Sequence, residues 1–175
     1  LENYLSSRSI SIKTGRKLCK EIHYRIGERA YFGVGLQNRS GGWELRNSYW
    51  KGSTSPKDVS LIKNDSKNLT ITEGMFDMLT LLELMPDIVN SHDLLVLNTT
   101  AFVKRMIKEI GKYENVELFL DRDKAGMGMT ELLLEKCPNS RDMSSLYRGF
   151  KDINEWKAKS AKDEVRKRIQ DVSLS

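Results

Sequence analysis

Hydrophobic and polar positions over residues 21–50 fall into short runs that predict an antiparallel β meander. The runs at residues 22–26, 30–36 and 43–46 are rich in β-branched and aromatic residues, which favour strands. Turn-forming residues at 27–28 and 38–42 separate these runs. Residues 1–20 carry scattered apolar positions and are expected to form short helical pieces, and residues 51–66 are expected to form a loop or linker.

After residue 67 the pattern changes to strands and helices in alternation. Predicted strands cover residues 69–72, 94–97 and 116–120, and predicted helices cover about 75–85, 101–113 and 127–136, with a charged helix over 161–172. Alternation of this kind implies a parallel sheet with helices packed against it. The sequence therefore predicts an α/β protein in which residues 1–66 form a small, basic, mainly antiparallel subdomain and residues 67–175 form the parallel sheet with C-terminal helices.

Composition narrows the class of protein. With 175 residues and 39% hydrophobic residues, the chain can bury one substantial core. No apolar run is long enough to span a bilayer and no secretory signal opens the chain, so an intracellular, cytoplasmic location is expected. Cys19 and Cys137 stand alone, which argues against a structural zinc site. The start at Leu1, within a helical segment, suggests a domain cut from a longer protein.

Charge is distributed unevenly along the chain. Residues 1–63 hold 12 Lys or Arg and 5 Asp or Glu, whereas residues 64–175 hold 17 and 19. A basic first part attracts polyanions, and nucleic acid is the natural partner. Charge alone supports an ordinary solvated surface equally well.

Four acidic residues lie where the predicted strands end or a helix begins. Glu73 follows the first strand of the parallel sheet, Asp121 and Asp123 follow the third, and Asp152 precedes a helix. Ligands bind beyond the carboxyl ends of parallel strands, so these side chains are expected to meet at one edge. Carboxylates alone suit Mg²⁺ or Mn²⁺. Each acidic residue taken singly could instead be a helix N-cap.

Three segments together resemble a known family. Ile71-Thr72-Glu73-Gly74-Met75-Phe76-Asp77, residues 116–126 and Lys151-Asp152-Ile153-Asn154-Glu155-Trp156 look like the signatures of the Toprim domain, in the order and spacing of bacterial DnaG-type DNA primases and primase-like proteins of mobile elements. The resemblance covers about residues 67–158. It implies a Toprim fold, catalytic roles for Glu73, Asp121 and Asp123, and Mg²⁺ (or Mn²⁺) held by these three with Asp152. Asn154 departs from the second Asp that is usual in primases, so the second metal is expected to be held more weakly.

The function implied by this resemblance is metal-dependent nucleotidyl transfer in primer synthesis during DNA replication. The partners implied are a DNA template, nucleoside triphosphates, and a helicase or other replication protein. A Toprim nuclease and a catalytically silent nucleic-acid-binding module remain as alternatives. Because the chain lacks the zinc-binding module and the helical region of full primases, little activity is expected from it alone.

Five further positions are candidates for nucleotide or nucleic-acid contact. Arg46, Lys51 and Lys57 could neutralise phosphate, and Lys124 follows the Asp-Arg-Asp signature. Asp77 lies one helical turn beyond Glu73, where it could brace the site, bind a nucleotide or simply face solvent. The neighbouring aromatic residues suit base stacking or a small core equally well, namely Trp43, Tyr49 and Trp50.

Overall fold

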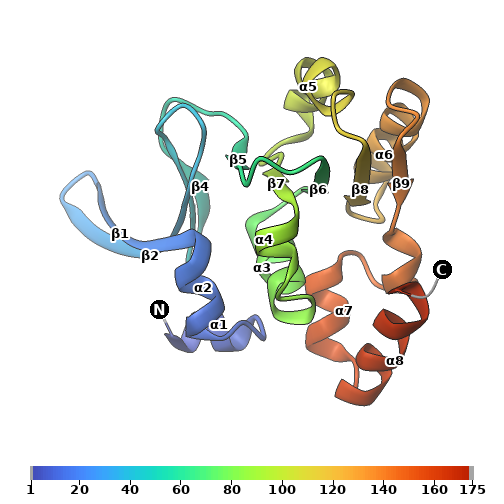
Figure 1. Cartoon of the computed structure of the whole chain (residues 1–175). Helices are drawn as coiled ribbons and strands as arrows, with labels where there is room; N and C mark the ends of the chain where they lie inside the picture. The colour runs from blue at the N-terminus through green and yellow to red at the C-terminus, as the bar shows by residue number, and fades with distance from the viewer. Residues whose placement is uncertain (1, 174–175) are drawn as a thin grey trace.

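The computed structural model describes residues 2–173, and its N-terminal part is an antiparallel sheet with two helices (Figure 1). The sheet has strand order β1-β2-β3-β4, with every neighbouring pair antiparallel, so the predicted meander is confirmed. The two short helices confirm the expectation for residues 1–20. The elements are α1 (Glu2–Ser7), α2 (Ile12–Leu18), β1 (Cys19–Ile26), β2 (Arg29–Gln37), β3 (Trp43–Arg46) and β4 (Lys51–Ser53).

The second part is a five-stranded, mostly parallel sheet, as the alternating pattern predicted. Its strand order is β5-β7-β6-β8-β9, and only β5 runs antiparallel to its neighbour. The strands are β5 (Ser60–Ile62), β6 (Asn68–Thr72), β7 (Asp93–Val96), β8 (Asn115–Phe119) and β9 (Ser140–Asp142). The helices are α3 (Met75–Leu84), α4 (Ile88–Ser91), η1 (Thr100–Phe102), α5 (Val103–Ile110), α6 (Lys124–Lys136), η2 (Ser144–Tyr147), α7 (Ile153–Lys159) and α8 (Lys162–Ser173).

Some element predictions were wrong in detail. The expected loop at residues 51–66 contains β4 and β5, and β9 was not predicted. Each of these strands is three residues long, too short to show an alternating pattern, and each forms by pairing with a longer neighbour. The helix expected at 101–113 begins as the 3-10 turn η1 and ends at Ile110, and the helix expected from 127 already begins at Lys124.

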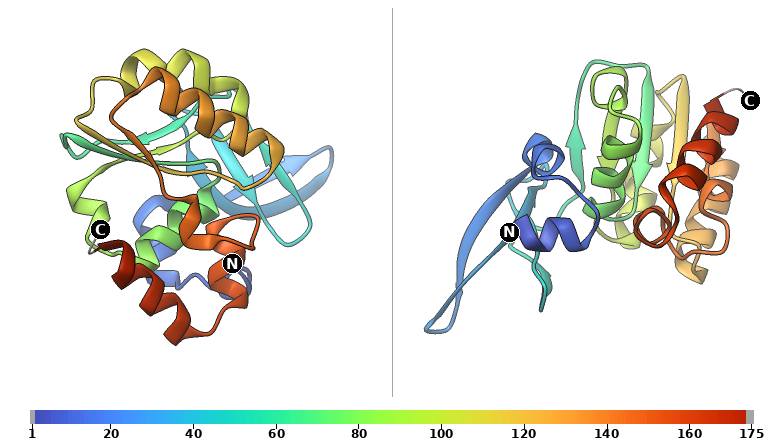
Figure 2. Two further views of the ribbon diagram at one scale, coloured as in Figure 1. Left: turned by 90° about the vertical axis from the view of Figure 1, so that its right-hand side faces the viewer. Right: turned by 90° about the horizontal axis from the view of Figure 1, so that it is seen from below.

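Helices cover both faces of the parallel sheet (Figure 2). On one face, α5 and α6 pack on a core that includes Ile71 and Leu118. On the other face, α3 shares a core with α1, α2 and β2. A third cluster joins α3 to η2, α7 and α8 around the fully buried Trp156. Helix α3 therefore contacts both the N-terminal part and the C-terminal helices.

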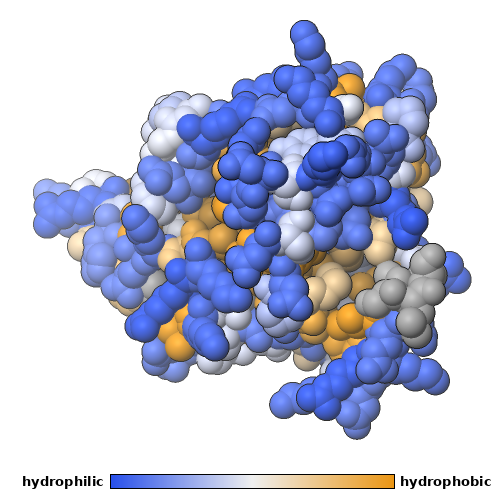
Figure 3. Space-filling model, in the orientation of Figure 1, coloured by the Kyte–Doolittle hydropathy of each residue, from blue (hydrophilic) through white to orange (hydrophobic). Residues whose placement is uncertain are grey.

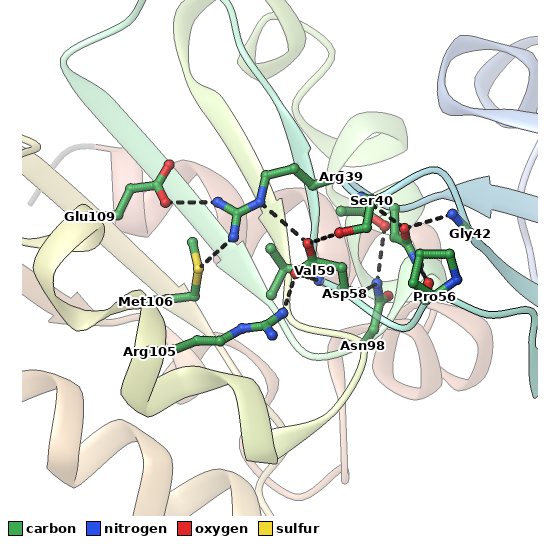
Figure 4. A network of polar contacts seen from close by, with 12 residues as sticks. Arg39, Ser40, Gly42, Pro56, Asp58, Val59, Asn98, Arg105, Met106 and Glu109 are labelled. Atoms are coloured by element: carbon green, nitrogen blue, oxygen red, sulfur yellow. Dashed lines mark hydrogen bonds and ion pairs between the residues drawn. The ribbon is translucent and has the colours of Figure 1, made fainter.

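Asp58 holds the two sheets together from the segment between them (Figure 4). Its carboxylate accepts a hydrogen bond from Ser40 Oγ at 2.6 Å and forms ion pairs with Arg39 and with Arg105 of α5. Its carbonyl accepts a hydrogen bond at 2.9 Å from Nδ2 of Asn98, which lies two residues after the end of β7. These contacts fix the turn between β2 and β3 against α5 and against the segment that follows β7.

The surface in the view of Figure 3 is mainly hydrophilic, with apolar side chains showing between the elements. No helix within residues 2–173 is long and apolar enough to cross a membrane.

Candidate active site

The carboxyl ends of β6 and β8 lie side by side, and they place two of the predicted acidic residues together. Thr72 pairs with Phe119 at the ends of these parallel strands, so Glu73 and Asp121 leave the sheet at neighbouring points. The turn after β8 is tight, because a Cβ atom at Gly126 would lie 2.0 Å from the carbonyl oxygen of Asp121. Only glycine allows α6 to start this close to the end of the strand.

Acidic and basic side chains face each other across one cavity of about 420 Å³ between the two sheets. Glu73, Asp77, Asp121 and Asp152 contribute its acidic wall. Its lining from the N-terminal part consists of Tyr4, Arg8, Arg46, Asn47, Tyr49, Trp50 and Lys51. The cavity thus combines groups suited to a cation with groups suited to phosphate.

The acidic wall is electrostatically unfavourable in the absence of a cation. Burial, with the nearby charges of Asp121 and Asp123, raises the pKa of Glu73 from 4.5 to about 7. Burial, with the charges of Asp152 and Asp121, raises the pKa of Asp77 well above its usual range. Within the described part of the chain, Glu73 Oε2 and Asp77 Oδ1 are buried without a hydrogen-bond partner. Carboxylate oxygens in this state are suited to bind a divalent cation.

A lysine that the sequence patterns did not single out contacts two of the predicted ligands. Lys151 Nζ lies 3.2 Å from Asp121 Oδ2 and 3.2 Å from Asp123 Oδ2. Hydrogen bonds to these two carboxylates raise the pKa of Lys151. In the sequence Lys151 is marked only by its position directly before Asp152, and that position does not predict a contact with Asp121 or Asp123. Lys151 offsets part of the negative charge at the acidic wall.

Asp123 and Asp152 also act as helix N-caps, which the sequence indicated as the alternative to a role as metal ligand. Asp123 Oδ1 accepts hydrogen bonds from the backbone N–H groups of Ala125 and Gly126, each at 3.0 Å, and the Gly126 bond followed by Lys151 lowers the pKa of Asp123. Asp152 Oδ1 accepts from the N–H of Glu155 at 2.7 Å. Each carboxylate retains a second oxygen that the cap does not use.

The carboxylate oxygens are of the type that Mg²⁺ prefers, but they are not arranged as a complete set of metal ligands. Among residues 2–173, no three His, Cys, Asp or Glu side chains are grouped so that they could hold a metal ion as they stand. In the structure Asp121 and Asp123 contact Lys151, and Asp123 and Asp152 each accept hydrogen bonds at the start of a helix. The metal assignment to these residues and Glu73 therefore stays a prediction.

The remaining candidates divide into two groups. Arg46 and Lys51 line the cavity, whereas Lys57 and Lys124 are exposed and do not. Asp77 is only 7% exposed, so its interpretation as a solvent-facing helix residue is wrong. Asn154 is also buried. Its side-chain amide donates to Thr80 Oγ1 and to the carbonyl of Arg8, both at 2.9 Å, and thus joins α7 to α3 and to the residue after α1.

Comparison with known proteins gives two family matches. Residues 70–156 match the family model described as Toprim-like. Residues 1–55 match a model described as a domain of unknown function. No curated protein matches the chain.

Three solved structures share the fold. The primase fragment of the bacteriophage T7 primase-helicase protein has a TM-score of 0.69 at 22% identity, with 95% of this chain and 73% of that chain covered. A bacteriophage T7 lagging-strand DNA polymerase structure with primase domains bound to an RNA/DNA hybrid and dTTP gives 0.67 at 20% identity, covering 95% and 90%. The zinc-binding and RNA polymerase domains of Aquifex aeolicus primase give 0.56 at 16% identity, covering 97% and 55%.

Proposed function

Because the chain carries a Toprim-like domain over residues 70–156 on a fold shared with primase fragments, we propose that it catalyses metal-dependent nucleotidyl transfer in primer synthesis. The observation that carries the proposal is the cavity in which acidic side chains with raised pKa values face Arg46 and Lys51. Its substrates would be a DNA template and nucleoside triphosphates. A helicase or another replication protein would work beside it.

Each wall of the cavity has its own task in this proposal. Glu73, Asp121 and Asp152 of the acidic wall would hold Mg²⁺ together with Asp123, which does not itself line the cavity. The ion would supply charge neutralisation on the triphosphate and activation of the attacking hydroxyl. In the metal-free protein Glu73 has a pKa of about 7, so it would exchange a proton near neutral pH before Mg²⁺ binds. Arg46 and Lys51 would bind phosphate oxygens from the opposite wall.

A catalytically silent nucleic-acid-binding module is the second candidate. It is favoured by the contact of Lys151 with both Asp121 and Asp123 and by the lack of a ready three-carboxylate group among the described residues. In such a module, Lys151 would replace the cation permanently. A Toprim nuclease, which would use the same carboxylates to activate water, differs from the primase-like proposal in its product.

One experiment separates these functions. The chain is incubated in excess over a labelled single-stranded DNA template with nucleoside triphosphates and Mg²⁺ or Mn²⁺, and both longer and shorter products are measured. We expect slow nucleotide incorporation that is lost in Asp121→Asn and kept in Asp163→Asn, an exposed carboxylate of α8. Cleavage without incorporation would identify a nuclease.

Metal binding is measured in parallel by Mn²⁺ titration with electron paramagnetic resonance. We expect Asp121→Asn to weaken Mn²⁺ binding and Asp163→Asn to leave it unchanged. Absence of both incorporation and Mn²⁺ binding would support the silent module and refute the primase-like proposal.

A further inference from the structure

A row of aromatic side chains lies on the outer face of the N-terminal sheet. Tyr24 of β1 and Tyr31 of β2 are direct cross-strand partners, and their rings stack with centroids 5.7 Å apart and planes 21° apart. The Trp50 ring, just before β4, lies 5.4 Å from the Tyr24 ring. We call Tyr31, Tyr24 and Trp50 the aromatic row. Tyr24 and Tyr31 belong to the β1–β2 hairpin, which projects from the body of the protein (Figure 1).

Strand register shows that this row faces away from the core. Side chains alternate between the two faces of a strand, so Tyr31 lies on the face opposite to Val34 and Leu36. Val34 and Leu36 are 2% and 3% exposed and belong to the core shared with α3. Trp50 remains 38% exposed and Ile26, on the same face as the row, 52%. The aromatic row thus lies on a face that is open to solvent at Trp50 and Ile26.

The backbone beneath the row is shaped to keep an indole flat. A Cβ atom at Gly52 would lie 2.0 Å from the ring atoms of Trp50. The ring therefore rests directly on the main chain of β4 and presents its other side outward. A flat, exposed indole beside stacked tyrosine rings offers planar surfaces that suit nucleic-acid bases.

Charge on the outer face favours an anionic partner. The strand positions that share this face include two charged residues, Lys20 and Arg29, and both are exposed cations. The acidic Glu21 and Glu44 lie on the other face by the same register, together with the cations Arg25, Arg46 and Lys51. The outer face thus differs from the other face in carrying no acidic residue at its strand positions. Binding of an apolar protein surface would explain the exposed aromatic rings. It would not explain why the charged residues on this face are cations.

The row also leads to the cavity described above. Trp50 belongs to the aromatic row and, with Tyr49 and Lys51, lines the cavity that contains Glu73. Tyr49 is 97% exposed. We propose that the outer face of the N-terminal sheet binds single-stranded nucleic acid, whose bases stack on Tyr31, Tyr24 and Trp50. The stacking proposal stands independently of the proposed nucleotidyl transfer. Only the further idea that the bound strand is delivered to the carboxylates rests on that proposed function.

Binding of a fluorescently labelled oligothymidylate tests the proposal by anisotropy, in EDTA so that no metal chemistry contributes. Base stacking on one aromatic side chain is worth about 1–3 kcal/mol, so Tyr31→Leu is expected to weaken binding by roughly 5-fold to 150-fold. Phe32→Leu is the matched control, because Phe32 is 52% exposed on the other face of the same strand. We expect the control to bind like the original chain. Circular dichroism and thermal unfolding establish that both variants are folded.

A second measurement does not depend on any change in affinity. Oligothymidylate should quench the tryptophan fluorescence of the original chain, and most of the quenching should disappear in Trp50→Phe. Equal weakening by Tyr31→Leu and Phe32→Leu would overturn the proposal. Tight binding of a duplex that is just as sensitive to Tyr31→Leu would also overturn it.

Self-association provides the last outcome. If sedimentation shows that Tyr31→Leu abolishes a dimer without affecting oligothymidylate binding, the row is a protein interface and the proposal is wrong. The two proposals can fail separately. Oligothymidylate binding without nucleotide incorporation in Mg²⁺ would count against the proposed function alone, and incorporation with no effect of the row would count against stacking alone.

Discussion

Replacing Glu73 by Gln should stabilise the metal-free protein, since the glutamate is held where its charge is unfavourable. Its pKa rises from 4.5 to about 7 on folding. A difference of this size corresponds to about 3 kcal/mol, and partial solvent access should reduce it to about 1–2 kcal/mol. Between these two pH values the folded protein binds a proton that the unfolded chain has released. The contribution of Glu73 to stability is therefore present below pH 4.5 and is lost as pH rises through about 7.

Urea unfolding in EDTA at pH 5 and pH 8 measures the effect. We expect Glu73→Gln to raise the free energy of unfolding by about 1–2 kcal/mol at pH 8 and by much less at pH 5. Glu131→Gln is the control, since Glu131 is exposed on α6 and does not line the cavity. A ligand that binds only the folded state stabilises it, and Glu73→Gln should bind Mg²⁺ more weakly. Added Mg²⁺ should therefore raise the free energy of unfolding of the original chain more than that of Glu73→Gln.

Two results would refute this reasoning. One is equal stability of Glu73→Gln and the original chain at pH 8. The other is a gain of the same size at both pH values, which would indicate a packing effect rather than the removal of a charge.

Three further changes test other parts of the structure. Lys151→Met should tighten Mn²⁺ binding about fivefold in titrations, because it removes a cation that contacts Asp121 and Asp123; weaker binding would contradict this. Trp156→Ala should lower the free energy of unfolding by about 3–5 kcal/mol in urea, since Trp156 is 0% exposed. Tyr147→Phe should cost about 1–2 kcal/mol in the same assay, because its hydroxyl donates a buried 2.7 Å bond to the Leu120 carbonyl; no loss would mean that this carbonyl finds another donor.

The sequence predicted those elements whose pattern is carried within the element itself. Strands β6 and β8 are apolar runs next to turn signals, and both were predicted within one or two residues. Strands β5 and β9 depend on neighbours far along the chain, because β5 pairs with β7 and β9 with β8. Three residues are too few to show a strand pattern by themselves, and their sequence does not reveal a distant partner strand. Strands β5 and β9 were therefore not predicted from the sequence.

The same distinction applies to the site. The positions of Glu73 and Asp121 follow from strand ends, which the sequence reveals, and the structure places both at one cavity. The contact of Lys151 with Asp121 joins residues 30 positions apart along the chain, so no local pattern predicts it. The burial of Asp77 depends on the packing of α3 against α7 and the N-terminal part, which also lies beyond sequence reasoning.

The acidic wall opposes folding, so other regions must supply the stability that keeps it in place. Burial raises the pKa values of Glu73, Asp77 and Asp121 alike, and each raised pKa marks a carboxylate that the fold disfavours in its charged form. Beside this wall, the cluster around Trp156 and Tyr147 anchors the C-terminal helices on α3. Binding of a divalent cation would relieve the repulsion at the wall without changing this cluster. Stability gained from Mg²⁺ should therefore depend on the carboxylates and persist in Tyr147→Phe, whereas Asp121→Asn should remove most of it.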